Sequence, residues 1–291
     1  MRAAALLLAL GACKPELGAP ASLVTTTEVL AVRGEPAEAK PGEAVTYRLL
    51  VASPGGTVTT PDAAWGFCIA PKPLTENNVV ADACLGQDAI APITNSAPQV
   101  SAGTPADACS RFGPDVPPPT MAGEPPLRPR DPDITGGYYQ PLVVQVDGVL
   151  TFGLERVTCN LANAPVDVSI EYRMRYMVNQ NPKLQPPAFP ASVARGTTIE
   201  IAASWDAPET FPVFDIPTQS LIDHRESMRV SWFATAGQFD QDRTGRDEND
   251  PATSTTNHWR APDAAGVVYF WIVLRDSRGG VDFVSADLMV E

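Results

Sequence analysis

Apolar and polar residues alternate along much of this chain with the period of an extended strand. Between positions 63 and 69, for example, Trp65, Phe67 and Ile69 stand at every second position. In a β-strand such residues share one face, so the alternation predicts half-buried strands. In the first half of the chain we predict strands over 25–32, 44–52, 63–69, 142–146, 149–154 and 166–178.

The segment 166–178 carries the clearest alternation in the chain. Every second residue from Val168 to Tyr176 is apolar or aromatic, and the residues between them are polar or charged. This pattern is typical of a strand with one buried face. Asp147-Gly148, between 142–146 and 149–154, has the composition of a two-residue hairpin turn.

The second half of the chain predicts another group of strands. They cover 197–205, 211–216, 227–235, 267–274 and 283–290, with an acidic loop over about 238–256. The segment 267–274 is apolar at every position, as expected of a central strand that is covered on both faces. The residues Arg275 to Gly280 then form a glycine-rich turn.

Proline marks both an insertion and a domain boundary. The chain has 30 prolines in 291 residues, about twice the usual share, which argues against long helices. From about 87 to 140 the strand pattern dissolves, and we predict a long surface insertion there. Four prolines between 179 and 190 indicate a linker. We therefore predict an all-β protein with two β-sandwich modules, at 23–180 and 183–291.

The amino terminus has the composition of an export signal. Met1-Arg2 is followed by the apolar run 3–10 and by Gly11-Ala12-Cys13, so we predict a signal peptide over 1–12. Leu10-Gly11-Ala12-Cys13 resembles the lipobox of bacterial lipoproteins. The resemblance implies that Cys13 is acylated, palmitate included, and holds the protein on a membrane of the cell envelope, more specifically the outer membrane. A buried helix with a chance cysteine is the alternative. Residues 13–22 would form a flexible tether.

The other four cysteines are consistent with an oxidising compartment. Cys68, Cys84, Cys109 and Cys159 predict two disulfides, with three connectivities open. We favour Cys84–Cys109, which would close the insertion, together with Cys68–Cys159. A zinc site of four cysteines is improbable because their spacings are too wide.

The last strands resemble a known family. Trp259-Arg260-Ala261-Pro262, the apolar strand 267–274 and the turn Asp276-Ser277-Arg278-Gly279-Gly280 are similar to the final hairpin of bacterial immunoglobulin-like and PKD-like modules. The resemblance implies an immunoglobulin-like β-sandwich for 183–291. We expect a similar sandwich, with the insertion added, for 23–180.

Charge and motifs restrict the chemistry. The net charge of −13 disfavours nucleic acid as a partner, because phosphate backbones are repelled. Only two histidines, His224 and His258, are available, and no nucleophile elbow, phosphate loop or zinc-protease motif occurs. We therefore expect a protein without enzymatic activity.

The acidic loop offers a weak calcium candidate. Asp240 and Asp242 with Gly245 match the start of a calcium-binding loop, and Asp247 would be a further ligand, but Pro251 replaces the final glutamate. The alternative is a solvated turn in which these carboxylates pair with the two arginines of the loop. Calcium is the only cofactor that we consider.

We favour a lipid-anchored protein of the cell envelope with a structural or binding role. Two other functions remain open. A calcium-dependent adhesive module is one. The other is a secreted hydrolase, whose carboxylates would come from the loops; the candidates are Asp223, Glu226, Asp240, Asp242 and Glu248. For a protein or polysaccharide partner, Tyr138 and Tyr139 are the aromatic pair most suited to exposure. We expect Trp205, Trp232, Trp259 and Trp271 to be core residues.

Overall fold

The computed structural model describes residues 20–71, 80–94, 98–111, 121, 134–161 and 164–291. Cys13 and the proline-rich segments 112–120 and 122–133 lie outside the described residues. Within them the chain forms strands β1 to β20 and three short helices, so the predicted all-β fold is confirmed. No helix in this part of the chain has the length and apolar character that crossing a membrane requires.

The first module contains two sheets. Sheet I has the strand order β2-β9-β8-β5-β6, and sheet II has the order β1-β3-β4 with β7 also paired to β3. The bounds are β1 Glu28–Glu35, β2 Glu38–Ala39, β3 Ala44–Ser53, β4 Gly56–Thr57, β5 Ala63–Cys68, β6 Ile90–Ile93, β7 Gln99–Gly103, β8 Gly137–Val146 and β9 Val149–Thr158. The helices are α1 Asp82–Leu85, α2 Ala108–Arg111 and α3 Val166–Arg175.

The second module also contains two sheets and a separate hairpin. Sheet III has the order β11-β20-β19-β15-β17, sheet IV has the order β10-β12-β18-β16, and β13 pairs with β14. The bounds are β10 Leu184–Gln185, β11 Ser192–Val193, β12 Thr198–Trp205, β13 Thr210–Asp215, β14 Ser220–Arg225, β15 Met228–Ala234, β16 Gln238–Phe239, β17 Arg243–Arg246, β18 Ser254–Arg260, β19 Gly266–Asp276 and β20 Val281–Val290.

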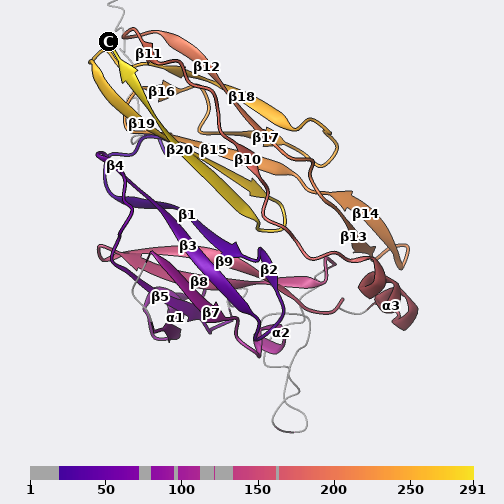
Figure 1. Ribbon diagram of the computed structural model, residues 1–291. Helices are drawn as coiled ribbons and strands as arrows, with labels where there is room; N and C mark the ends of the chain where they lie inside the picture. The colour runs from indigo at the N-terminus through magenta and orange to yellow at the C-terminus, as the bar shows by residue number, and fades with distance from the viewer. Residues whose placement is uncertain (1–19, 72–79, 95–97, 112–120, 122–133, 162–163) are drawn as a thin grey trace, which may run out of the picture.

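The four sheets lie in a stack, in the order I, II, III, IV (Figure 1). Tyr47 of sheet II and Trp65 of sheet I belong to the core of the first module. Trp259 of sheet IV and Phe270 of sheet III belong to the core of the second module, with their ring centroids 4.9 Å apart. The stack therefore has an apolar layer inside each sandwich and a third layer between the two sandwiches.

The layer between the modules explains why β19 is apolar at every position. Trp271 and Val273 face sheet II, where they belong to one buried cluster with Leu30 and Leu50. The alternate residues of β19 face sheet IV instead. The expectation of a central strand covered on both faces is confirmed. Burying a large apolar side chain such as Trp271 contributes roughly 2–3 kcal/mol, so the modules hold each other through a true core.

The amino end of the described chain crosses to the second module before the first module begins. Leu23 forms a parallel bridge with Ala234, the last residue of β15. The amide of Val24 donates to the carbonyl of Ala234 at 2.9 Å, and the amide of Ala234 donates to the carbonyl of Ser22 at 2.9 Å. Residues 22–24 thus extend sheet III at the carboxyl end of β15.

Most predicted strands are confirmed to within a few residues, but 166–178 is not a strand. Residues Val166–Arg175 form helix α3. When every second residue is apolar, apolar residues also recur at every fourth position, which is close to one helical turn. Val168 and Tyr172 therefore share one face of the helix, and this face is buried. Asp167 in the first turn and Arg175 in the last turn favour the helix through its dipole.

Two segments expected to be irregular contain strands. The predicted insertion, where it is described, includes β6, which pairs with β5, and β7, which pairs with β3. The predicted acidic loop includes β16, β17 and the first residues of β18. These strands are short or polar, so their own alternation is weak and their neighbours in the sheets stabilise them.

The predicted turn at Asp147-Gly148 is confirmed. Val146 and Val149 are paired directly across it, and both turn residues have positive φ, 49° and 80°. This is the backbone geometry that a tight two-residue hairpin requires.

The predicted disulfide connectivity is wrong, although all four cysteines are paired. Cys68 bonds to Cys84 and Cys109 bonds to Cys159. Cys68 ends β5, and α1 carries Cys84 onto the outer face of sheet I, within one apolar cluster. Spacing in the sequence gave no basis for choosing between the three connectivities.

The two disulfides should differ in their contribution to stability. The Cys109–Cys159 bond closes a separation of 50 residues, and the Cys68–Cys84 bond closes one of 16. In the chain-entropy description these contribute about 4 and about 3 kcal/mol. Urea unfolding of the double variants C109S/C159S and C68S/C84S should show the larger loss in the first. A larger loss in the second would contradict this explanation.

Candidate functional site

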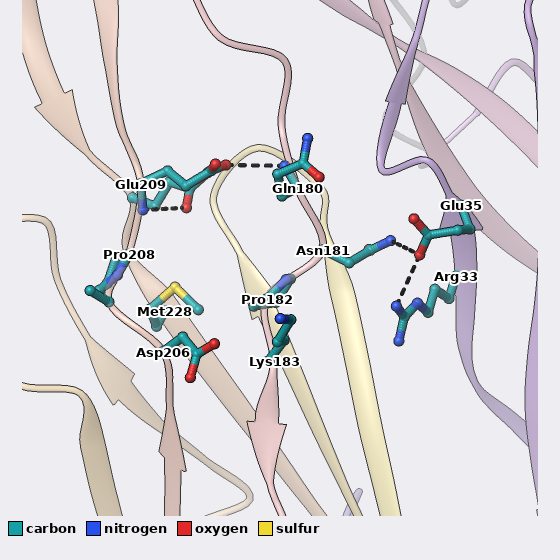
Figure 2. A pocket seen from close by; sticks show the side chains of 12 residues that line it. Arg33, Glu35, Gln180, Asn181, Pro182, Lys183, Asp206, Pro208, Glu209 and Met228 are labelled. Atoms are coloured by element: carbon teal, nitrogen blue, oxygen red, sulfur yellow. Dashed lines mark hydrogen bonds and ion pairs between the residues drawn. The ribbon is translucent and has the colours of Figure 1, made fainter.

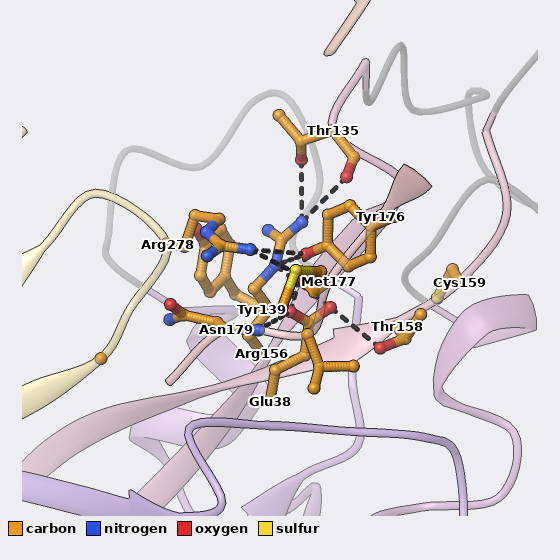
Figure 3. A network of polar contacts seen from close by, with 12 residues as sticks. Glu38, Thr135, Tyr139, Arg156, Thr158, Cys159, Tyr176, Met177, Asn179 and Arg278 are labelled. Carbon is orange, nitrogen blue, oxygen red and sulfur yellow. Dashed lines mark hydrogen bonds and ion pairs between the residues drawn. The ribbon is translucent and has the colours of Figure 1, made fainter. Parts of the chain in front are cut away.

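A cluster of buried charged side chains lies where the two modules and their linker meet (Figure 3). Glu38 and Arg156 come from the first module, Tyr176 and Asn179 from the segment after α3, and Arg278 from the turn between β19 and β20. Glu38, Arg156 and Arg278 are each no more than 2% exposed. Charges this deeply buried are stable only when they are paired and fully hydrogen-bonded.

Glu38 is the acceptor at the centre of this junction network. Its Oε1 accepts from Thr158 Oγ1 at 2.9 Å and lies 3.4 Å from Arg156 Nε. Its Oε2 accepts from Tyr176 Oη at 2.7 Å and from the backbone amide of Asn179 at 2.9 Å. One carboxylate of the first module therefore fixes both the side chain and the backbone of the linker.

Arg278 performs the corresponding task from the second module. Its Nε donates to Glu226 Oε1 at 2.7 Å and its Nη2 to Glu209 Oε2 at 2.7 Å. Its Nη1 donates to the carbonyl of Met177 at 3.0 Å and to Tyr176 Oη at 3.3 Å. The guanidinium thus joins two strand ends of the second module to the linker.

Asp276 shapes the turn that presents Arg278. Its Oδ1 accepts from the backbone amides of Arg278 at 2.9 Å and Gly280 at 2.8 Å. This gives the Asp-Ser-Arg-Gly-Gly turn a physical role: the aspartate caps the turn, which holds the arginine toward the junction.

The hydroxyl of Tyr176 connects the two halves of the network. It donates to Glu38 and accepts from Arg156 Nε at 3.3 Å and from Arg278 Nη1 at 3.3 Å. Burial raises the pKa of Tyr176 to about 12, against the opposing effect of the two guanidinium groups. The hydroxyl therefore stays protonated and keeps its donor role near neutral pH.

A polar cleft opens beside the network, between the modules (Figure 2). Its volume is about 360 Å³, and its floor is the linker from Gln180 to Lys183. Glu35 accepts from Arg33 at 3.0 Å and from Asn181 Nδ2 at 3.1 Å. Glu209 accepts from the amide of Gln180 at 3.0 Å. The carboxylates of Glu35 and Glu209 are thus occupied by contacts that tie the linker to both modules.

Glu226 is the buried carboxylate at the back of this cleft. Its Oε2 accepts from the amide of Glu209 at 3.0 Å, in addition to its bond with Arg278. Burial and the charge of Asp276 raise the pKa of Glu226 to about 7, although Arg278 opposes the shift. Each of its oxygens has a partner within the protein, which is the geometry of a structural ion pair.

Glu155 is a second unusual carboxylate, inside the first module. It is 1% exposed, and among the described residues its Oε1 has no hydrogen-bond partner; the same is true of the hydroxyl of Tyr47. Burial, followed by the charges of Glu38 and Glu35, raises the pKa of Glu155 to about 9. A Cβ at Gly34 would collide with this carboxyl group, so the glycine makes the room that it occupies.

Tyr138 and Tyr139, the aromatic pair predicted to be exposed, lie in different surroundings. Tyr138 packs beside the Cys109–Cys159 cluster, and Tyr139 donates from its hydroxyl to the carbonyl of Ser277 at 3.2 Å. The guanidinium of Arg156 lies 5.5 Å from the Tyr139 ring centroid. Both rings are half-buried, and Tyr139 contributes to the contact between the modules.

The structure does not bring the calcium candidates together. Within the described residues no group of three or more His, Cys, Asp or Glu side chains is placed to hold a metal ion. Asp240 Oδ2 lies 3.3 Å from His258 Nδ1, and Asp247 accepts from the amides of Asn249 and Asp250 in a local turn. The backbone that follows Asp242 is strand β17.

Three of the five hydrolase candidates are divided between two places, and neither place includes Asp240 or Asp242. Glu226 belongs to the junction, whereas Asp223 and Glu248 line a hollow of about 250 Å³ together with His224. Glu248 Oε2 lies 2.8 Å from His224 Nδ1, and Asp223 Oδ1 accepts from Arg175 Nη2 at 2.7 Å. Each of the two carboxylates in this hollow therefore already contacts another side chain of the protein.

Sequence reasoning missed the junction network almost completely. Glu38 lies in a polar segment that carries no motif, and its partners are 118 to 141 positions away, as in the pairs Glu38–Arg156 and Glu38–Asn179. The only available signal was the resemblance of the turn around Arg278 to an immunoglobulin-like hairpin.

Comparison with known proteins identifies no family. The sequence matches no protein-family profile and no curated protein. Among solved structures, a lipoprotein from Bacteroides thetaiotaomicron is 16% identical with a TM-score of 0.25, over 38% of this chain and 82% of that chain. The Yersinia pseudotuberculosis adhesin InvE is 11% identical with a TM-score of 0.22, over 90% of this chain and 58% of that one.

Invasin, a bacterial integrin-binding protein, is 11% identical with a TM-score of 0.23, over 91% of this chain and 39% of that chain. The chain thus spans little more than half the length of InvE and less than half that of invasin. At these TM-scores the likenesses carry no argument, and the assignment of two β-sandwich modules rests on the sheets of this chain.

Removing the guanidinium from the junction should destabilise the protein strongly. Arg278→Met leaves Glu226 and Glu209 buried or half-buried without their cation, which should cost about 3–5 kcal/mol. Urea unfolding followed by tryptophan fluorescence measures the loss. Arg229→Met, an exposed arginine of the same module, is the matched control and should change stability by less than about 0.5 kcal/mol. A similar effect of both variants would contradict the structural role of Arg278.

Glu155 should make stability fall with rising pH. Because its folded pKa lies near 9 and its ordinary pKa near 4.5, the folded state retains a proton that the unfolded state loses across this window. The contribution of Glu155 to the free energy of unfolding is fully present below about pH 4.5 and is lost as pH rises toward 9. The free energy of unfolding of the Glu155→Gln variant should therefore rise relative to that of the parent as pH increases. The difference should grow by on the order of 1 kcal/mol per pH unit between pH 5 and 8.

Urea titrations of both proteins at several pH values provide this test. Glu226 titrates in both proteins, so its contribution cancels in the difference. A difference that stays constant with pH would show that Glu155 is ionised in the folded state.

Proposed function

We propose that this chain is a lipid-anchored component of a bacterial cell envelope that acts without catalysis, as a rigid scaffold for binding. The segment Leu10-Gly11-Ala12-Cys13 supports the anchor, because small residues before a cysteine are the pattern at which lipoproteins are cleaved and acylated. The two disulfides support an oxidising compartment outside the cytoplasm.

The observation that carries the scaffold proposal is the way in which the modules are joined. Many tandem modules are connected by a flexible linker and a small polar contact. In this chain an apolar layer that includes Trp271 and Leu50 is combined with the buried network of Glu38 and Arg278. A hinge at this position would expose apolar surface and separate buried charges, so the two modules act as one body.

The direction of the stack also supports the proposal. The described chain starts beside Ala234, at the end of sheet III where β19 begins. Helix α3 and the β13–β14 hairpin lie at the opposite end of the molecule (Figure 1). A tether at the amino terminus would therefore present the α3 end away from the membrane.

The sites of the described residues support binding rather than catalysis. The carboxylates of the junction and of the hollow beside His224 are held by arginines, backbone amides or the His224 ring of the protein itself. A general acid or base needs a polar atom free to face substrate, and most oxygens of these carboxylates already have a partner within the protein. We propose the outer membrane as the location, in line with the expectation from the lipobox.

The anchor can be tested directly. In cells supplied with radiolabelled palmitate, the parent protein should incorporate label and sediment with membranes, because several acyl chains hold a protein durably on a bilayer. Cys13→Ser should lose the label and move to the soluble fraction. The variant C68S/C84S is the matched control, because it also loses thiols but should remain labelled. Equal membrane retention of the Cys13→Ser variant would refute the anchor.

A further inference from the structure

A hollow of about 630 Å³ lies between the start of β3 and the end of α3. Helix α3 lies at the end of the molecule opposite the carboxyl end of β15, where the described chain begins (Figure 1). Lys40 and Arg173 stand at its wall, with Thr158, Asn160 and Val178 among its other lining residues. Among the described residues, no aspartate or glutamate lines it. Its charged lining is thus wholly basic, although the chain has 34 acidic and 21 basic residues.

Both cations of the hollow are available to a ligand. Lys40 and Arg173 are exposed, and neither forms an ion pair or a side-chain hydrogen bond with any described residue. By contrast, the nearby Arg175 is occupied by Glu171 and Asp223, and Arg156 is buried against Glu38. Two unpaired cations that line the same hollow favour the binding of an anionic group there.

An apolar stripe on α3 adjoins the hollow. Val166, Ile170 and Met174 recur at every fourth residue and therefore share one helical face. Their exposed fractions are 77%, 44% and 76%, and Met177 just after the helix is 71% exposed. The opposite face of α3 is the one that packs on the β13–β14 hairpin. Exposed apolar side chains in a row commonly mark an interaction surface.

The stripe and the hollow adjoin along the chain at two points. Arg173 lies next to Met174 in the chain, and Val178, which lines the hollow, is 42% exposed and follows Met177. An occupant of the hollow would therefore meet apolar side chains on leaving it. The surface combines two free cations, a recess and an adjacent apolar strip.

We propose that this α3 surface binds a protein segment in which acidic and apolar side chains are neighbours. A carboxylate of the segment would enter the hollow between Lys40 and Arg173, and its apolar neighbours would lie on Ile170, Met174 and Met177. This deepens the proposed function by naming the binding surface and the chemistry of the partner, but it does not depend on the lipid anchor.

Charge complementarity and the stripe together select this partner. A nucleic acid could place phosphates at the two cations but would leave the apolar stripe exposed. An acidic polysaccharide would satisfy Lys40 and Arg173 but gains little from aliphatic side chains. Methionine, which adapts its shape to different apolar groups, is typical of surfaces that bind peptides.

Fluorescence anisotropy with a labelled peptide of alternating glutamate and leucine tests the proposal. The protein is the whole chain with Cys13→Ser, so the result is independent of acylation. The peptide should bind, and K40E/R173E should weaken binding by roughly tenfold or more. Met174→Ser should weaken it by roughly three- to tenfold. Arg260→Glu, the reversal of an exposed arginine in sheet IV, is the matched control and should leave binding unchanged.

Two further probes separate the contributions. A glutamine–leucine peptide should bind roughly tenfold more weakly than the glutamate–leucine peptide, and a glutamate–serine peptide should also bind more weakly. Equal binding of K40E/R173E and the parent would overturn the proposal. Tight binding of an oligoglucuronate with no binding of the acidic peptide would also overturn it, in favour of a polysaccharide site.

Discussion

The arrangement of this protein depends on a buried guanidinium at the tip of the β19–β20 turn. Arg278 reaches Glu226, Glu209 and the linker at distances of 2.7–3.3 Å, and Tyr176 passes the contact on to Glu38 of the first module. Removing such charges from water costs several kcal/mol for each ion, so the arrangement is stable only when all partners are present together. Each partner comes from a different segment of the chain.

The apolar layer and the polar network have different roles at this junction. Contacts such as those in the cluster of Trp271 and Leu50 are non-directional, so they favour association of the modules over many orientations. Hydrogen bonds to Glu38 and Arg278 are satisfied in only one arrangement. The apolar layer supplies most of the free energy of association between the modules, and the polar network selects their orientation. The scaffold proposal rests on the combination of both kinds of contact.

The sequence predicted those parts of the fold in which one local pattern has one structural meaning. The two-faced apolar run of β19 and the turn at Asp147-Gly148 are examples, since both are confirmed. Helix α3 shows the limit. Apolar residues at every second position also satisfy a spacing of four, and only the tertiary contacts of Val168 and Tyr172 decide between strand and helix. The cysteine pairing failed for a similar reason, because it depends on where α1 and α2 pack.

The candidate sites were less predictable than the fold. Glu38, Arg156 and Arg278 are widely separated in the sequence and carry no motif, so only the folded chain brings them together. The surface on α3 was hidden by the strand prediction, which assigned Ile170 and Met174 to a buried face with Val168. As a helix, the same residues are divided between a packed face and an exposed one.

The bridge between Leu23 and Ala234 has a mechanical consequence. Suppose that the amino end is held and the α3 end is pulled. Tension then enters the fold through Ser22 and Val24, whose backbone hydrogen bonds are made with β15 of the second module. The carboxyl-terminal sandwich would then bear the force before any strand of the first module does. The order of the modules along the chain is thus the reverse of the order in which they take up strain.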